Sequence, residues 1–268
     1  MVRGSYPHLL QGVRWNMNRL RLFPGERAAA LEATPAGRSA ATAETVVLIH
    51  GMLSSPASMR SLARALTAAR YRVHNWGYPT LRVSIAEHAD RLQCLLREVA
   101  GGQPEAGLHL VTHSMGGIIA RAAIREAADS RVARMVMLAP PNRGSHLTKW
   151  PLGPFEKCFP PLTELGLGAE SLVNQLPPPR GTEVGIIAAA HDAVVRLEST
   201  WLEGMRDHLI VGTNHRRLPR HGQAIAATLQ FLRAGRFGLA AEPVGPQPLV
   251  QPPHAAGPGP GPGRRHAA

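Results

Sequence analysis

A serine with small neighbours stands between a predicted strand and a predicted helix. The run VTHSMGG, residues 111–117, places Ser114 at this junction. A serine on such a sharp turn presents its hydroxyl above the end of a sheet, where it can attack a carbonyl carbon. Gly116 and Gly117 allow a close approach on the helix side. Thr112 occupies a position that is glycine in the usual G-x-S-x-G pattern, so we expect the strand to lie slightly farther from the helix.

A nucleophilic serine needs an acid that orients its base, and in this chain order the acid follows the serine. The sequence contains four aspartates. Asp90 precedes the serine, Asp129 falls at the end of the next predicted helix, and Asp207 opens the last predicted strand. Only Asp192 directly follows a predicted strand, VGIIAAA, and we therefore predict Asp192 as the acid.

The base that takes the serine proton is predicted at the end of the last strand. His215 ends the run HLIVGTNH, whereas His208 begins it at the opposite edge of the sheet. His221, in the following loop, remains the alternative, and His191 precedes Asp192 in the chain. We expect the side chain of His113 to point away from the site, because neighbours on a sharp turn diverge. His215 is the predicted base.

Negative charge that develops on the attacked carbonyl oxygen requires two fixed N–H donors. One is expected from Met115, the residue after the serine. The other is expected from Met52, in the loop that follows the His50-Gly51 pair and the first predicted strand. The alternative for His50-Gly51 is a simple turn that ends the strand.

Short apolar runs alternate with longer stretches of helical periodicity from Glu44 onward, which is typical of a doubly wound, mostly parallel sheet flanked by helices. Active-site groups in such a sheet lie at the carboxyl ends of its strands. The predicted strands are 45–49, 71–76, 108–112, 132–139, 184–190 and 208–212, and the predicted helices are 55–66, 85–99, 115–128 and 223–233.

Several of these runs resemble bacterial lipase- and esterase-like α/β-hydrolases: HGM, HSMGG, LAPPNRGSHL and FLRAGRF, over about residues 46–237. The resemblance implies the α/β-hydrolase fold, a Ser114–Asp192–His215 triad, and oxyanion donors at Met52 and Met115. We therefore expect cleavage of small-molecule or lipid acyl esters. No metal or cofactor is expected, because the side chains supply every role.

The chain divides into three predicted parts. Residues 1–43 form a basic arm and linker, 44–242 the hydrolase domain with a cap-like insertion at 140–182, and 243–268 a Pro/Gly-rich disordered tail. Apolar residues at helical spacing in the arm would suit peripheral membrane contact, and a helix packed on the domain or a loose arm is the alternative.

The composition narrows the classes of partner. The chain of 268 residues is 44% hydrophobic and carries a net charge of +12, almost all of it from arginine. Only 4% of residues are aromatic and no aromatic-basic stripe is present, so nucleic acid is not expected as a partner. We expect a cytoplasmic protein, and Cys94 is expected to be a buried thiol.

Three further functions keep the same triad: thioesterase, amidase and acyltransferase. A different class, a non-catalytic binding protein on the same fold, also stays open, because the fold alone does not determine function.

Overall fold

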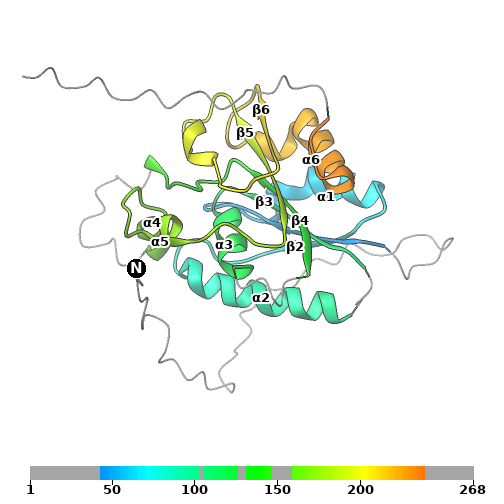
Figure 1. The fold of residues 1–268 in the computed structure, drawn as a ribbon, viewed down its shortest axis with the longest axis horizontal. Coiled ribbons are helices and arrows are strands. Elements are labelled where there is room, and N and C mark those ends of the chain that lie inside the picture. Colours follow the sequence, from blue (N-terminus) through cyan, green and yellow to red (C-terminus); the bar gives the residue numbers. More distant parts are fainter. Residues whose placement is uncertain (1–42, 103–105, 126–130, 147–158, 239–268) are drawn as a thin grey trace, which may run out of the picture. The chain divides into compact units, whose positions relative to one another are not determined.

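The computed structural model of the chain describes residues 43–102, 106–125, 131–146 and 159–238 (Figure 1). The predicted arm at 1–43 falls almost wholly outside these residues, and the tail at 243–268 falls wholly outside them. No helix in the described ranges is long and apolar enough to cross a bilayer.

Six parallel strands form a single sheet in the order β2-β1-β3-β4-β5-β6. This confirms the predicted doubly wound sheet, and each predicted strand end lies within one residue of the observed one. The strands are β1 Thr45–Ile49, β2 Arg72–Trp76, β3 Leu108–His113, β4 Val132–Leu138, β5 Glu183–Ala189 and β6 Asp207–Val211.

Both faces of the sheet are buried because successive residues of each strand enter different cores. In β1, Val47 and Ile49 join one apolar cluster while Val46 and Leu48 join the other. Such runs, apolar on both faces, are what a parallel sheet covered by helices requires.

Helices cover the two faces of the sheet separately (Figure 1). Residues of α2 (Ile85–Gly101) and α3 (Met115–Ala123) belong to one cluster, and those of α1 (Arg60–Ala68) and α6 (Gly222–Ala234) to the other. The helix predicted from residue 55 divides into a 3-10 turn, η3 (Pro56–Met59), followed by α1. Because α1 and α2 cover opposite faces, the winding direction reverses between β1 and β3, where such sheets bind ligands.

The described part of the 140–182 insertion connects β4 to β5 and packs partly against the domain. It contains α4 (Pro160–Glu164) and α5 (Leu172–Gln175), and Leu165 and Val173 are buried in the cluster shared with α2 and α3. The Glu164 carboxylate accepts a hydrogen bond from the N–H of Ile85 at 2.7 Å, which ties the insertion to the start of α2. Residues 147–158, which include much of the predicted apolar side of a cap, lie outside the described residues.

The prediction for Cys94 is wrong: this thiol is exposed. Leu92 and Leu96 occupy the buried face of α2, and a residue two positions from each lies on another side of the helix. A position within an apolar stretch of a helix therefore does not establish that the residue faces the core.

Candidate active site

Loops that follow β1, β3, β5 and β6 meet at the carboxyl edge of the sheet. Ser114 directly follows β3, and Asp192 and His215 follow β5 and β6. Hydrogen bonds continue past the ends of the last two strands, from Ala190 N–H to the Val211 carbonyl (2.9 Å) and from His191 N–H to the Thr213 carbonyl (3.0 Å). These bonds hold the loops of the predicted acid and base beside one another.

Ser114 adopts a backbone conformation that side chains rarely take, with φ 53° and ψ −127°. Its N–H donates to the Leu138 carbonyl at the end of β4 (2.9 Å), so the strained turn is fixed from the neighbouring strand. The turn approaches the first strand closely as well: a Cβ on Gly51 would lie 2.9 Å from the Ser114 Cβ. A strained serine held in this way is the geometry expected of a nucleophile.

The two glycines after the serine make different close contacts. A Cβ on Gly116 would lie 2.5 Å from the backbone oxygen of His50, so this glycine permits α3 to approach the loop after β1. A Cβ on Gly117 would lie 3.1 Å from Oγ1 of Thr112, which is fully buried. The space for the threonine that replaces the usual glycine therefore comes from Gly117.

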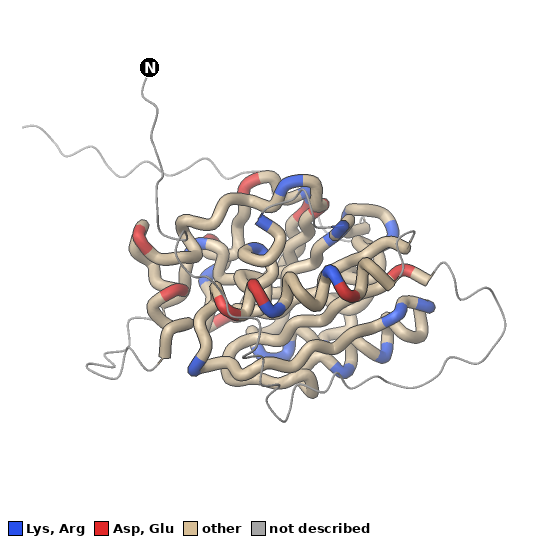
Figure 2. Tube along the Cα trace, turned by 90° about the horizontal axis from the view of Figure 1, so that it is seen from below, with Lys and Arg blue, Asp and Glu red and all other residues tan. Residues whose placement is uncertain are grey.

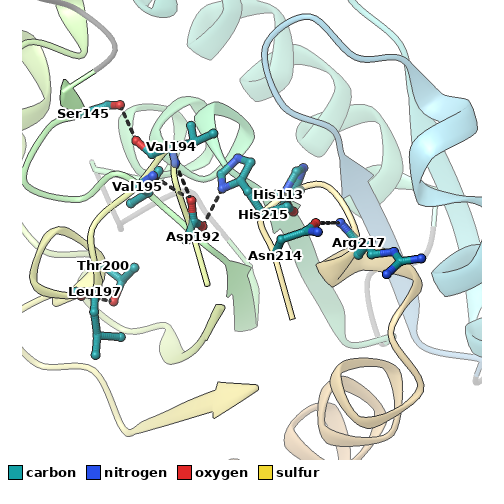
Figure 3. A network of polar contacts seen from close by, with 10 residues as sticks. All are labelled: His113, Ser145, Asp192, Val194, Val195, Leu197, Thr200, Asn214, His215 and Arg217. Carbon is teal, nitrogen blue, oxygen red and sulfur yellow. Dashed lines mark hydrogen bonds and ion pairs between the residues drawn. The ribbon is translucent and has the colours of Figure 1, made fainter. Parts of the chain in front are cut away.

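Asp192 and His215 form a pair whose side chains are only 4% and 10% exposed (Figure 3). Nδ1–H of His215 donates to Oδ2 of Asp192 at 2.7 Å, while Oδ1 accepts from the N–H groups of Val194 and Val195, both at 2.8 Å. Burial raises the pKa of the Asp192 carboxyl, but the hydrogen bond and charge of His215 and these two N–H groups outweigh burial and hold the pKa below its usual value. The carboxylate is thus kept ionised and leaves Nε2 of His215 as the basic nitrogen.

Ser145 supports the acid loop and was not identified from the sequence. Its hydroxyl donates to the Val194 carbonyl at 2.9 Å (Figure 3). Its N–H donates to the Leu165 carbonyl at 2.9 Å. Val194 in turn donates its N–H to Asp192, so Ser145 links the insertion to the acid. The residue lies in the LAPPNRGSHL run that carried the family resemblance, and that run was the available signal.

The prediction that His113 points away from the site is wrong. Its ring lies 4.8 Å from the ring of His215, and its Nε2–H donates to the His215 backbone carbonyl at 3.1 Å (Figure 3). Burial, followed by the nearby charge of His215, lowers the pKa of His113 to about 3. A neutral imidazole beside the serine thus places His215 next to the nucleophile turn.

The His50-Gly51 pair is more than a turn that ends a strand. Nδ1–H of His50 donates to the Gly51 carbonyl at 3.0 Å, and this carbonyl belongs to the same peptide group as the N–H of Met52. The ring of Tyr78 stacks on His50 at 4.3 Å, and the Tyr78 hydroxyl donates to the His50 carbonyl. Within the described residues, no hydrogen bond uses the N–H of Met52 or that of Met115. Both predicted donors are therefore unused by other groups in the described part of the chain.

The other candidate acids and bases have different contacts. The Asp207 carboxylate accepts from the N–H groups of His208 (2.8 Å) and Phe237 (2.7 Å). His208 bonds through Nε2 to Thr200 Oγ1 at 2.9 Å. His221 is the residue at the start of α6, and His191 is exposed. None of these groups is paired with Asp192 as His215 is.

A buried arginine fixes the segment after β4. Arg121, in α3, is 2% exposed and donates to the side-chain oxygen of Asn142 (3.1 Å) and to the Leu176 carbonyl (2.7 Å). Asn142 in turn donates to the Thr200 carbonyl at 2.8 Å. These bonds fasten the start and the end of the insertion to the helix that begins after the nucleophile. Burial lowers the pKa of Arg121 to about 10, so it stays charged at neutral pH.

In the described part of the chain, no three His, Cys, Asp or Glu side chains lie close enough together to hold a metal ion.

Comparison with solved structures identifies the fold as that of the α/β-hydrolases. A Bacillus licheniformis lipase, BlEst2 in its mature form, aligns with a TM-score of 0.61 at 15% identity over 76% of this chain and 96% of the lipase chain. The type II thioesterase YbtT of the yersiniabactin pathway aligns with a TM-score of 0.55 at 16% identity over 74% of this chain and 94% of its own. At these identities the similarity establishes the fold alone.

Sequence comparison gives the family. A family model described as a domain of unknown function, DUF7379, matches residues 16–151, and the chain belongs to this family. A Drosophila melanogaster protein, "Lysosomal thioesterase PPT2 homolog", is 31% identical over 111 residues. The match spans 39% of this chain and 38% of that relative, so the chain covers about two fifths of the curated relative's length.

Proposed function

We infer that the protein is a serine hydrolase that cleaves acyl esters through an acyl-enzyme on Ser114. The observation that supports this proposal is the 2.7 Å pair of His215 with an ionised Asp192, on a loop that the ring of His113 bonds, while His113 directly precedes a serine with positive φ. A pre-oriented imidazole and a strained serine are both costly to maintain, and nucleophilic catalysis would explain why the chain has both.

The first half-reaction uses each group once. Nε2 of His215 accepts the Ser114 hydroxyl proton as Oγ bonds to the ester carbonyl carbon, and the negative charge on the carbonyl oxygen is met by the N–H groups of Met52 and Met115. The ionised Asp192 stabilises the imidazolium. When the carbonyl re-forms, the bond to the leaving alcohol breaks and the alcohol oxygen takes the proton from His215, which leaves Ser114 acylated.

The second half-reaction repeats these roles with water. His215 accepts a proton from a water molecule that attacks the acyl carbon, and the same two N–H groups hold the oxyanion. Collapse of this intermediate breaks the bond to Ser114 Oγ, which recovers its proton from His215 as the carboxylic acid leaves. No cofactor takes part in either half-reaction.

Thioesters are the second candidate substrate class. The Drosophila relative carries a thioesterase name, and so does one of the two structural neighbours described above. A thiol leaving group needs less proton assistance than an alcohol, so the same groups would serve. The insertion at 140–182 is proposed as the wall that selects the acyl group, as inserted segments do in other enzymes.

Labelling with a fluorophosphonate tests the proposal directly. The purified protein should become covalently modified at Ser114, as located by peptide mass spectrometry, and Ser114→Ala should abolish labelling without changing the circular dichroism spectrum. A folded protein that is not labelled would favour a non-catalytic binding protein. Rates on matched oxygen esters and thioesters of graded chain length then decide between the two substrate classes.

A further inference from the structure

A concentration of positive charge borders the candidate site on the side of α1. Arg60 and Arg64 lie one turn apart on the exposed side of α1, and Arg216, Arg217 and Arg220 follow β6. We call these five exposed arginines the basic rim. The turn η3 contacts η7 (Leu218–Arg220), and α1 contacts both η7 and α6. Two segments far apart in sequence therefore form one surface.

The basic rim lacks compensating negative charge. Residues 50–71 and 208–238 contain no Asp or Glu, and none of the five arginines forms an ion pair within the described residues. Helix α2, on the other face of the sheet, carries acidic and basic residues in mixed order, seen as red and blue along the helix nearest the viewer in Figure 2. The positive charge is thus concentrated on one side of the domain, next to His215.

Leu53 adds an exposed apolar group at the same edge of the sheet, where its N–H donates to Thr80 Oγ1 at 3.1 Å. It lies in the loop after β1 with 72% of its surface exposed and with φ 53°, a conformation that Gly or Asn adopts at lower cost. Exposure of a large aliphatic side chain and positive φ are both unfavourable for stability in water. The leucine is therefore better explained by a contact that the isolated chain does not make.

The chemistry of this surface indicates its partner. Every aromatic residue of the two segments is buried (Tyr71, Phe231 and Phe237), so bases would find no side chain on which to stack. A single exposed leucine also does not provide the apolar centre typical of a protein interface. Spread positive charge with a small apolar group is what binds to anionic lipid headgroups and inserts at their boundary.

We propose that the basic rim and Leu53 bind the surface of a membrane that contains anionic lipids. His215 and Met52 immediately precede Arg216 and Leu53 in the chain, so the proposed surface adjoins the two loops that carry these residues of the candidate site. The binding does not depend on turnover. Delivery of a lipid acyl ester to Ser114 from that surface is the part that rests on the proposed function.

Vesicle co-sedimentation of the full chain tests the proposal. We expect binding to vesicles of phosphatidylcholine with phosphatidylglycerol, little binding to phosphatidylcholine alone, and release as salt rises from about 0.1 M to about 0.5 M. Arg60→Gln/Arg64→Gln should weaken binding by roughly tenfold or more. The matched control Arg97→Gln/Arg180→Gln removes the same charge from exposed positions elsewhere and should change binding by less than about twofold.

Leu53→Asn separates insertion from charge. Asparagine tolerates positive φ, so this variant should unfold at the same temperature as the native chain or a higher one, and yet bind the anionic vesicles more weakly. Equal losses of binding in the two arginine pairs would overturn the proposal and assign binding to net charge. Undiminished binding in both the rim pair and Leu53→Asn would also overturn it and assign binding to residues 1–43. Fluorophosphonate labelling without vesicle binding would contradict membrane binding and leave the proposed hydrolase intact. Vesicle binding without labelling would contradict the proposed hydrolase and leave membrane binding intact.

Discussion

At the scale of single residues, Asp192 accepts hydrogen bonds on both oxygens, and only one of these bonds serves the proposed chemistry. Asparagine at this position can still accept the two loop N–H groups, but its amide presents a donor or a neutral acceptor to His215. We expect Asp192→Asn to lower kcat for a short aryl ester by about 10⁴-fold with little change in KM. Asp207→Asn is the matched control, since Asp207 holds Phe237 and should affect stability alone. A larger loss of kcat in the control would show that the acid is misassigned.

His113 predicts a pH dependence of stability. Because burial lowers its pKa to about 3 in the folded protein, the unfolded chain, with the ordinary value of 6.5, binds a proton first as the pH falls. The free energy of unfolding should therefore decrease below pH 6.5, by at most about 1.4 kcal/mol per pH unit from this group. His113→Gln, which does not titrate, should show a shallower decrease in urea denaturation at stepped pH values. Parallel curves for the two proteins would contradict a neutral, buried His113.

The sequence predicted those residues that follow strands and missed those that support them. Chain order and strand ends were sufficient to single out Asp192 and His215, because a parallel sheet brings its carboxyl ends to one edge. The contact between His113 and His215 depends on how two loops pack against each other, and no periodicity encodes that. The support of Asp192 by Ser145 likewise crosses between distant loops.

At the scale of elements, the glycine pair that begins α3 should respond unequally to the same substitution. A Cβ at Gly116 meets two backbone oxygens, at 2.5 and 2.6 Å, and backbone cannot yield cheaply. A Cβ at Gly117 meets the flexible end of Met137 at 2.7 Å and Thr112 Oγ1 at 3.1 Å. We expect Gly117→Ala to cost about 1–3 kcal/mol and Gly116→Ala clearly more, as measured by chemical denaturation.

Thr112 provides the control for this pair. Its buried hydroxyl has no hydrogen-bond partner among the described residues, so Thr112→Ala removes the second-nearest obstacle to a Cβ at Gly117, after the flexible end of Met137. The cost of Gly117→Ala should shrink by about 0.5 kcal/mol or more on the Thr112→Ala background, whereas the cost of Gly116→Ala should not. Equal costs on both backgrounds would mean that Gly117 does not accommodate the threonine.

The elements themselves were predictable where propensity and burial agree. Strands with apolar residues on both faces, such as β1 and β5, have few alternative structures, and their ends matched closely. The division of the first helix into η3 and α1 was not predictable, because Pro56 is compatible with the first turn of either helix type. The side of α2 that carries Cys94 depends on which neighbouring residues the sheet buries.

At the scale of the whole molecule, the order of the strands in the sheet could not be predicted from local sequence patterns. The alternation of strands and helices predicts a parallel sheet, but the position of β2 outside β1 requires α1 and α2 to cover different faces. Right-handed crossovers then follow from that choice. The reversal between β1 and β3 is what brings the loop of His50 beside Ser114, so the site depends on a topological fact that no local pattern contains.

The last described residues complete the apolar cluster that α1 and α6 share, and they define where the chain can be truncated. Phe237 is 8% exposed, its ring lies 5.0 Å from that of Phe231, and its N–H donates to Asp207 at 2.7 Å. A chain that ends at Gly238 keeps all of these contacts, and we expect it to match the full protein in Tm and in esterase rate. A chain that ends at Arg236 loses them and should be less stable by about 2–4 kcal/mol, which corresponds to a fall in Tm of roughly 5 °C or more. Differential scanning calorimetry of the two truncations makes the comparison, and equal Tm values would show that the core closes without Phe237.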